Sequence, residues 1–92
     1  MTFTYPAVFH KEADGSFTGY FPDLEGCSFG GTTLDEAINS AIAAEKTWIE
    51  VQAEDEENEG MPFISDPADI TLQEGEFIRT IGVIMHFEEG FY

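Results

Sequence analysis

The chain has very little positive charge. Its 92 residues include 3 Lys and Arg against 19 Asp and Glu, for a formal net charge of −16 at pH 7. Binding to a nucleic-acid backbone depends on cations that release condensed counterions, so this composition disfavours direct nucleic-acid binding. It favours either a basic protein partner, which an acidic surface attracts at long range, or acidic charge that serves solubility alone.

Cysteine and long apolar runs are nearly absent as well. Cys27 is the only cysteine, which excludes an internal disulfide and a cysteine-rich metal site. A single cysteine also fits a reducing cellular compartment. Residues 1–10 lack the basic region and apolar run of a signal peptide, and no apolar run approaches the about 18 residues of a membrane span. We therefore expect a soluble, cytoplasmic protein with no membrane partner.

Three strands are expected in the first third of the chain. Residues 3–10 alternate apolar and polar side chains with a period of two, and residues 16–21 return after an Asp14-Gly15 turn, which predicts a hairpin. Residues 27–31 predict a third, short strand. Because Pro6 cannot donate a hydrogen bond to a ladder, it predicts an edge or an irregularity in the first strand.

One long helix is expected from Thr33 to about residue 53. The Thr33 hydroxyl can accept from the N–H of Glu36, whose carboxylate can accept in return from the N–H of Thr33, which makes a capping box. Apolar residues then recur in steps of three and four, typical of a helix packed on a sheet; they are Leu34, Ala37, Ile38, Ala41, Ile42, Trp48, Ile49 and Val51. The acidic run at residues 54–60 predicts an exposed loop.

The last expected strand covers residues 76–87 and has apolar residues on both faces, which is typical of a central strand covered on both sides. The single long helix can cover only one face. A second copy that contacts Ile78, Ile84 or Phe87 is therefore expected on the other, or else residues 61–70 of the same chain. The predicted fold class is α+β, in the order β-β-β-α-β, with one long helix on one face of the sheet.

Residues typical of catalysis or metal binding are sparse. His10 and His86 are the only histidines, and no Ser, Cys or Asp motif of known geometry flanks either one. Cys27 has no neighbouring cation to stabilise a thiolate, so we expect a small buried side chain. We predict no catalytic residue, no cofactor and no metal ion.

An alternative hypothesis is an acidic, metal-dependent nuclease of the ribonuclease H type. Asp23, Glu25, Asp35 and Glu36 lie near predicted strand and helix ends, and such carboxylates can hold Mg²⁺ or Mn²⁺. Turn formation already explains Asp23, however, and helix capping explains Asp35 and Glu36. A structural role for these carboxylates is therefore preferred.

Three motifs together resemble HicB-family antitoxins: Tyr-Pro-Ala-Val-Phe at 5–9, Phe-Pro-Asp-Leu-Glu-Gly-Cys at 21–27 and Thr-Leu-Asp-Glu-Ala at 33–37. The resemblance runs from Tyr5 to about Trp48, and residues 62–70 with the strand after them are similar to the family's continuation. It implies a reduced, catalytically empty ribonuclease H-like fold. It also implies neutralisation of a small, basic HicA-type toxin that cleaves messenger RNA.

Many members of that family continue into a DNA-binding segment, whereas this chain stops at Phe91-Tyr92 without a basic helix. We therefore expect residues 1–92 to form a single antitoxin domain with no DNA-binding tail. Tyr20 should face away from Phe17 and Phe21, where an aromatic side chain can anchor a partner. Tyr20, Asp23 and Glu25, beside the hairpin and its following turn, are the expected toxin contacts.

Overall fold

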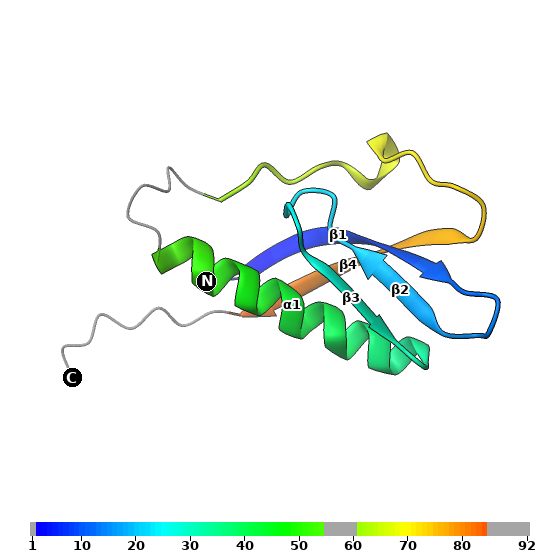
Figure 1. Cartoon of the computed structure of the whole chain (residues 1–92). Helices are drawn as coiled ribbons and strands as arrows, with labels where there is room; N and C mark the ends of the chain where they lie inside the picture. The colour runs from blue at the N-terminus through cyan, green and yellow to red at the C-terminus, as the bar shows by residue number, and fades with distance from the viewer. Residues whose placement is uncertain (1, 55–60, 85–92) are drawn as a thin grey trace.

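The computed structural model describes residues 2–54 and 61–84, which form a sheet with one long helix across one of its faces (Figure 1). The elements are β1 (Thr2–Lys11), β2 (Phe17–Tyr20), β3 (Ser28–Gly31), α1 (Leu34–Glu54), a 3₁₀ helix η1 (Pro67–Asp69) and β4 (Glu76–Ile84). The predicted α+β class and its β-β-β-α-β order are confirmed. Of the acidic loop expected at 54–60, Glu54 belongs instead to the end of α1, and residues 55–60 lie outside the described residues, as do residues 85–87 of the expected last strand.

The sheet is antiparallel throughout, in the order β3-β2-β1-β4. β4 pairs along nearly all of β1, from Thr2 opposite Ile84 to His10 opposite Glu76. β2 pairs only with the far end of β1, from Val8 to Lys11. No strand of the described sheet therefore lies on the β2 side of Pro6, which agrees with the irregularity predicted there.

The prediction that β4 is a central strand is wrong, because β4 lies at one edge of the described sheet. Its residues on the α1 side, Ile81 and Val83, are buried, whereas Ile84 on the other face is 65% exposed. The strand that is buried on both faces is β1, where consecutive residues 5–9 are all buried.

The main core lies between α1 and the odd-numbered side chains of β1. The ring of Phe9 is at its centre, with its centroid 4.9 Å from that of Phe29 and 5.3 Å from that of Phe77. Burial of each such side chain contributes roughly 1.5–3 kcal/mol. Other buried members are Tyr5, Ala7, Phe21, Leu24, Cys27, Ala37, Ala41 and Ile81.

The start of α1 follows half of the predicted capping box. The N–H of Glu36 donates to the Thr33 hydroxyl at 3.1 Å, as expected. The reciprocal half is wrong, since the Glu36 carboxylate accepts instead from the hydroxyl of Thr32, at 2.8 and 2.7 Å. The Thr32 hydroxyl thus takes the place of the Thr33 N–H as the donor to the Glu36 carboxylate, and the first turn is still capped.

The buried face of α1 differs from the predicted one at three positions. Ala37, Ala41 and Ile49 are fully buried, but Ile42 and Val51 are 38% and 63% exposed. The position between Ala41 and Ile49 is filled by Glu45, which is 0% exposed. In the part of the chain that the structure describes, no helix is long and apolar enough to cross a membrane.

Candidate functional site

The loop between β2 and β3, residues 21–27, is built from successive tight turns. The N–H of Leu24 donates to the carbonyl of Phe21 at 3.1 Å, and the N–H of Cys27 donates to the carbonyl of Leu24 at 3.0 Å. Gly26 has φ +79°, a left-handed conformation that glycine adopts without strain. Phe21, Leu24 and Cys27 are buried while Glu25 is exposed. The loop therefore presents Glu25 to solvent on an apolar base.

Asp23 is already engaged within the chain. Its carboxylate accepts hydrogen bonds from the backbone N–H of Ser65, at 2.8 Å, and from the Ser65 hydroxyl. The Tyr5 hydroxyl donates to the carbonyl of Pro62 at 2.6 Å. These bonds fix the segment 62–65 against the β2–β3 loop and β1. Asp23 thus has a structural function that its turn position did not reveal.

A groove of about 520 Å³ separates the β2–β3 loop from α1. The indole N–H of Trp48 donates to the carbonyl of Glu25 at 2.9 Å and so holds the two walls together. Most side chains on the α1 wall are small or apolar. The lining residues are Gly26 and Cys27 of the loop and Ser40, Ala43, Ala44, Thr47, Trp48, Val51 and Gln52 of α1.

A second hollow, of about 470 Å³, lies on the face of the sheet that α1 leaves uncovered. Tyr20 lines it and is 43% exposed, whereas Phe21 is buried. This confirms that Tyr20 faces away from the core. The other lining residues are Val8, His10, Thr18, Gly19, Ser28, Gln73 and Glu76.

The three expected contact residues therefore do not share one surface. Tyr20 lies on the sheet face opposite α1, and Glu25 lies beside the groove that α1 forms. Asp23 lies between them in the same loop and bonds to Ser65. A partner that contacts all three must reach around the β2–β3 loop.

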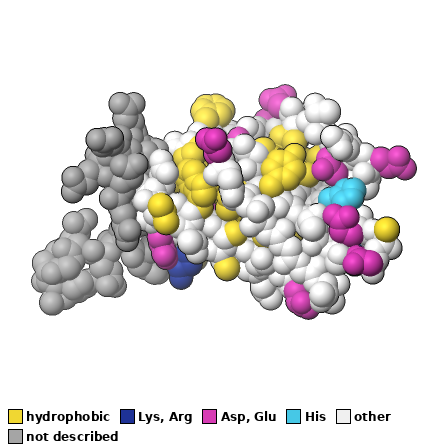
Figure 2. Space-filling view, viewed as in Figure 1, with side chains coloured by type: hydrophobic (Ala, Val, Ile, Leu, Met, Phe, Trp, Pro, Cys, Tyr) yellow, Lys and Arg dark blue, Asp and Glu magenta, His cyan; other side chains and the backbone are white. Residues whose placement is uncertain are grey.

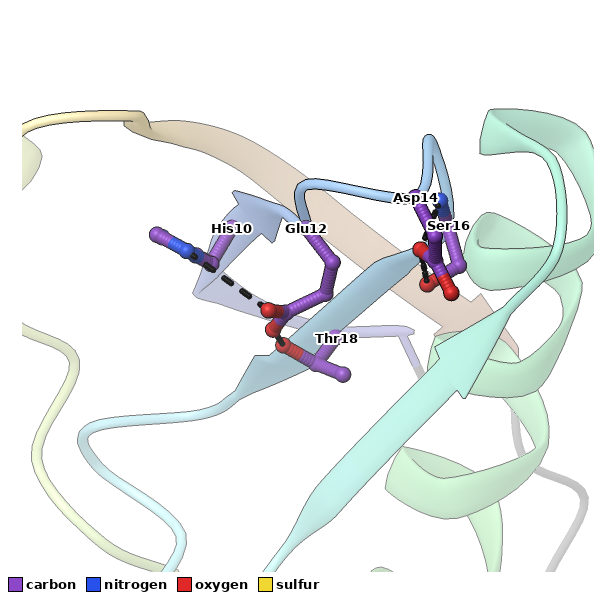
Figure 3. Close-up of polar contacts among 5 residues, drawn as sticks. All are labelled: His10, Glu12, Asp14, Ser16 and Thr18. Carbon is purple, nitrogen blue, oxygen red and sulfur yellow. Dashed lines mark hydrogen bonds and ion pairs between the residues drawn. The ribbon is translucent and has the colours of Figure 1, made fainter.

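The β1–β2 hairpin carries a small polar cluster (Figure 3). The Thr18 hydroxyl donates to the Glu12 carboxylate at 2.8 Å, and His10 Nε2 lies 3.9 Å from the same carboxylate. Asp14 accepts from the N–H and hydroxyl of Ser16, at 2.9 and 2.6 Å, and these hydrogen bonds lower the pKa of Asp14. The contacts close the turn and place His10 beside the Glu12 carboxylate.

The carboxylates of the nuclease hypothesis are not gathered into a site. Asp23 bonds to Ser65, and Glu36 bonds to Thr32 at the start of α1. Among the residues that the structure describes, no group of three or more His, Cys, Asp and Glu is arranged to hold a metal ion. The geometry therefore offers no support for metal-dependent cleavage.

Glu45 is the residue that the sequence interpretation missed. Neither of its carboxylate oxygens has a hydrogen-bond partner, and burial raises its pKa to about 8. Burial, and secondarily the nearby Glu45, raises the pKa of the Cys27 thiol to about 11, so Cys27 stays a protonated, buried side chain as predicted. The sequence does carry a signal for the burial of Glu45, since a spacing of four residues places it on one side of the helix with the buried residues Ala41 and Ile49.

Residues 5–88 match the family model described as the HicB_like antitoxin of bacterial toxin-antitoxin system. Two relatives from Synechocystis sp., UPF0150 protein ssr1765 and UPF0150 protein ssl0259, are each 35% identical to the chain, over 48 and 46 residues. The matches cover 52% and 50% of this chain and 61% and 63% of the relatives. The chain thus spans less than two thirds of the length of these relatives.

Two solved structures share the fold. A chain of the HicA3 and HicB3 toxin-antitoxin complex is 28% identical, with a TM-score of 0.65 over 85% of this chain and 94% of that one. The N-terminal domain of Burkholderia pseudomallei antitoxin HicB is 21% identical, with a TM-score of 0.76 over 90% of this chain and 100% of that one. Because the family model matches nearly the whole length, this chain belongs to the HicB-like antitoxin family of bacterial toxin–antitoxin systems.

Proposed function

We propose that this chain neutralises a small, basic HicA-type toxin by covering the surface with which the toxin engages messenger RNA. The observation that carries the proposal is a net charge of −16 on a domain of the HicB-like family. A toxin that binds RNA needs a cationic surface, and an acidic partner is attracted to that surface at long range. The similarity to a chain of the HicA3 and HicB3 complex supports a partner of this kind.

In this proposal the β2–β3 loop is the centre of the contact. Glu25 is exposed and free to face a cationic side chain, whereas Tyr20 offers its half-exposed ring only at the margin of the contact, on the adjoining sheet face. Asp23 contributes indirectly, since its bonds to Ser65 hold the loop in place. The protein acts in the cytoplasm as a binding protein, on a reduced ribonuclease H-like scaffold, without a cofactor.

Inhibition of RNA cleavage by the toxin tests this function. The purified chain is titrated into a HicA-type toxin with a single-stranded RNA substrate. We expect stoichiometric inhibition that weakens as salt is added, because salt screens the attraction between the two proteins. Cleavage that persists at saturating antitoxin would exclude the proposal.

A charge reversal locates the contact in the same assay. Glu25→Lys should weaken inhibition by at least about fivefold, because it puts a cation opposite a cationic partner. Asp69→Lys is the matched control, since Asp69 is also exposed but lies in η1. Equal effects of the two substitutions would indicate that only the total charge matters.

We also propose that the chain forms a homodimer through β4. Only one side of this nine-residue strand is paired in the described sheet, and Ile84 is exposed on the face away from α1. An unpaired edge is a template for a second copy. Because two chains of charge −16 repel, dimerisation should strengthen with salt, the opposite of toxin binding. A single monomeric species in sedimentation at every salt and protein concentration would rule the dimer out.

A further inference from the structure

The side of α1 that borders the groove carries mostly small side chains. Ser40, Ala43, Thr47 and Val51 recur in steps of three and four and so lie on one side of the helix. Their small side chains allow a second helix to approach within the 8–10 Å between axes at which helices pack. Val51 is 63% exposed here, although its spacing predicts a core residue. This side of α1 has the character of a helix-packing surface, and no second helix covers it within residues 2–54 and 61–84.

The opposite wall of the groove is fixed before any partner arrives. The hydrogen bond from Trp48 to the Glu25 carbonyl ties the loop to α1, and Cys27 beneath is nearly fully buried. A Cβ built at Gly26 has no heavy atom within 4 Å, so the space above the loop wall is open. A preformed groove requires little ordering on binding, which favours affinity.

Acidic side chains, together with Lys46, border the apolar floor of the groove. Glu36 lies one turn before Ser40 and Glu50 lies three residues after Thr47, so both border the packing side of α1, and both are exposed. Glu25 is exposed on the loop wall. Figure 2 shows hydrophobic side chains gathered where the C-terminal half of α1 meets the loop, with acidic and basic side chains beside them.

From these features we infer that the groove between α1 and the β2–β3 loop receives an amphipathic helix of the basic toxin. The apolar stripe of that helix would pack on Ala43, Thr47 and Val51, and its flanking Lys or Arg residues would face the glutamates. The inference rests on the proposed function and assigns the main contact to this groove. The hollow on the free sheet face suits an apolar stripe less well, since His10, Thr18, Ser28 and Glu76 line much of it.

Two arginine substitutions of equal charge separate the two surfaces. Ala43→Arg fills the groove, whereas Ser28→Arg places the same side chain in the hollow on the free sheet face, where Ser28 is exposed. Both substitutions change the net charge by the same amount, so the long-range attraction to a basic toxin is the same in the two variants. Thr47→Arg, one turn along α1, gives an independent second variant. The affinity of each chain for a HicA-type toxin is measured by calorimetry, and circular dichroism checks that each variant folds.

We expect Ala43→Arg and Thr47→Arg to weaken toxin binding by at least about tenfold and Ser28→Arg by less than about threefold. Loss of binding with Ser28→Arg alone would overturn the inference and assign the toxin to the free sheet face. Unchanged binding by both groove variants would also overturn it, while leaving the proposed function intact. A wild-type chain that binds no toxin would overturn the proposed function and this inference together.

Discussion

The carboxylate of Asp23 holds Ser65, a residue 42 positions later in the chain, through both its backbone N–H and its hydroxyl. The bond joins the β2–β3 loop to the segment that leads from α1 toward η1. Because Tyr5 also binds this segment through the Pro62 carbonyl, the loop and the segment form one unit against β1. The position of Glu25 and of one wall of the α1 groove thus depends on a contact outside the loop.

Asp23→Ala should destabilise the fold by about 1–3 kcal/mol, because the Ser65 N–H and hydroxyl lose their acceptors in a partly buried place. Asp23→Asn keeps one side-chain oxygen and should lose less. Urea unfolding measures both changes in the free energy of unfolding. Asp69→Ala is the control and should stay within about 0.5 kcal/mol, since Asp69 is exposed. An Asp23→Ala protein as stable as the control would show that the contact with Ser65 contributes nothing.

Gly19→Ala should be among the most damaging small substitutions. A Cβ at Gly19 would lie 2.4 Å from Cζ of Phe29 and 2.5 Å from the carbonyl oxygen of Val8, so either the ring or the strand pair must move. We expect a loss of at least about 2 kcal/mol in the free energy of unfolding. Thermal and urea unfolding both report it.

Gly82→Ala is the matched control in the same sheet. Its Cβ would meet only the Thr4 hydroxyl oxygen at 3.3 Å and the Phe3 carbonyl oxygen at 3.9 Å. Alanine also favours a strand more than glycine does, so the loss should stay below about 0.5 kcal/mol. Similar losses in the free energy of unfolding for the two substitutions would mean that the Phe29 ring can move aside without destabilising the fold.

The local elements of this fold follow from short-range patterns in the sequence. Alternation over residues 3–9 and the Asp14-Gly15 turn predict the hairpin, and Thr33 marks the start of α1 through its bond to the Glu36 N–H. These signals succeed because a strand period, a tight turn and a helix cap are each decided within a few residues. The exposed position of Tyr20 follows from the same alternation.

Contacts between distant segments could not be predicted in the same way. The apolar pattern of β4 indicates which residues share a face, but not whether one strand or two lie beside it. The pattern alone therefore cannot distinguish this edge strand from a central one. Asp23 fits a turn on its own, and nothing near Ser65 points back to it. The groove depends on the bond between Trp48 and the Glu25 carbonyl, which joins residues 23 positions apart.

The polarity of Glu45 misled the prediction of the α1 face, since a carboxylate is rarely placed in a core. The structure accommodates it by raising its pKa to about 8 from an ordinary value of 4.5. The folded protein therefore keeps the Glu45 proton up to about pH 8, whereas the unfolded chain releases it above about pH 4.5. Between these values the folded state binds more protons, so stability falls as pH rises.

Glu45→Gln removes this titration while it keeps the size and shape of the side chain. The stability of the variant relative to wild type should therefore increase with pH, by on the order of 3 kcal/mol between about pH 5 and about pH 8, and then level off. Urea unfolding of both proteins across this range measures the difference, and groups common to both largely cancel. Glu45→Met should show the same trend with a larger gain at every pH, because it also removes the two unpartnered oxygens from the core. A difference between Glu45→Gln and wild type that does not change with pH would mean that water reaches the carboxylate in the folded state.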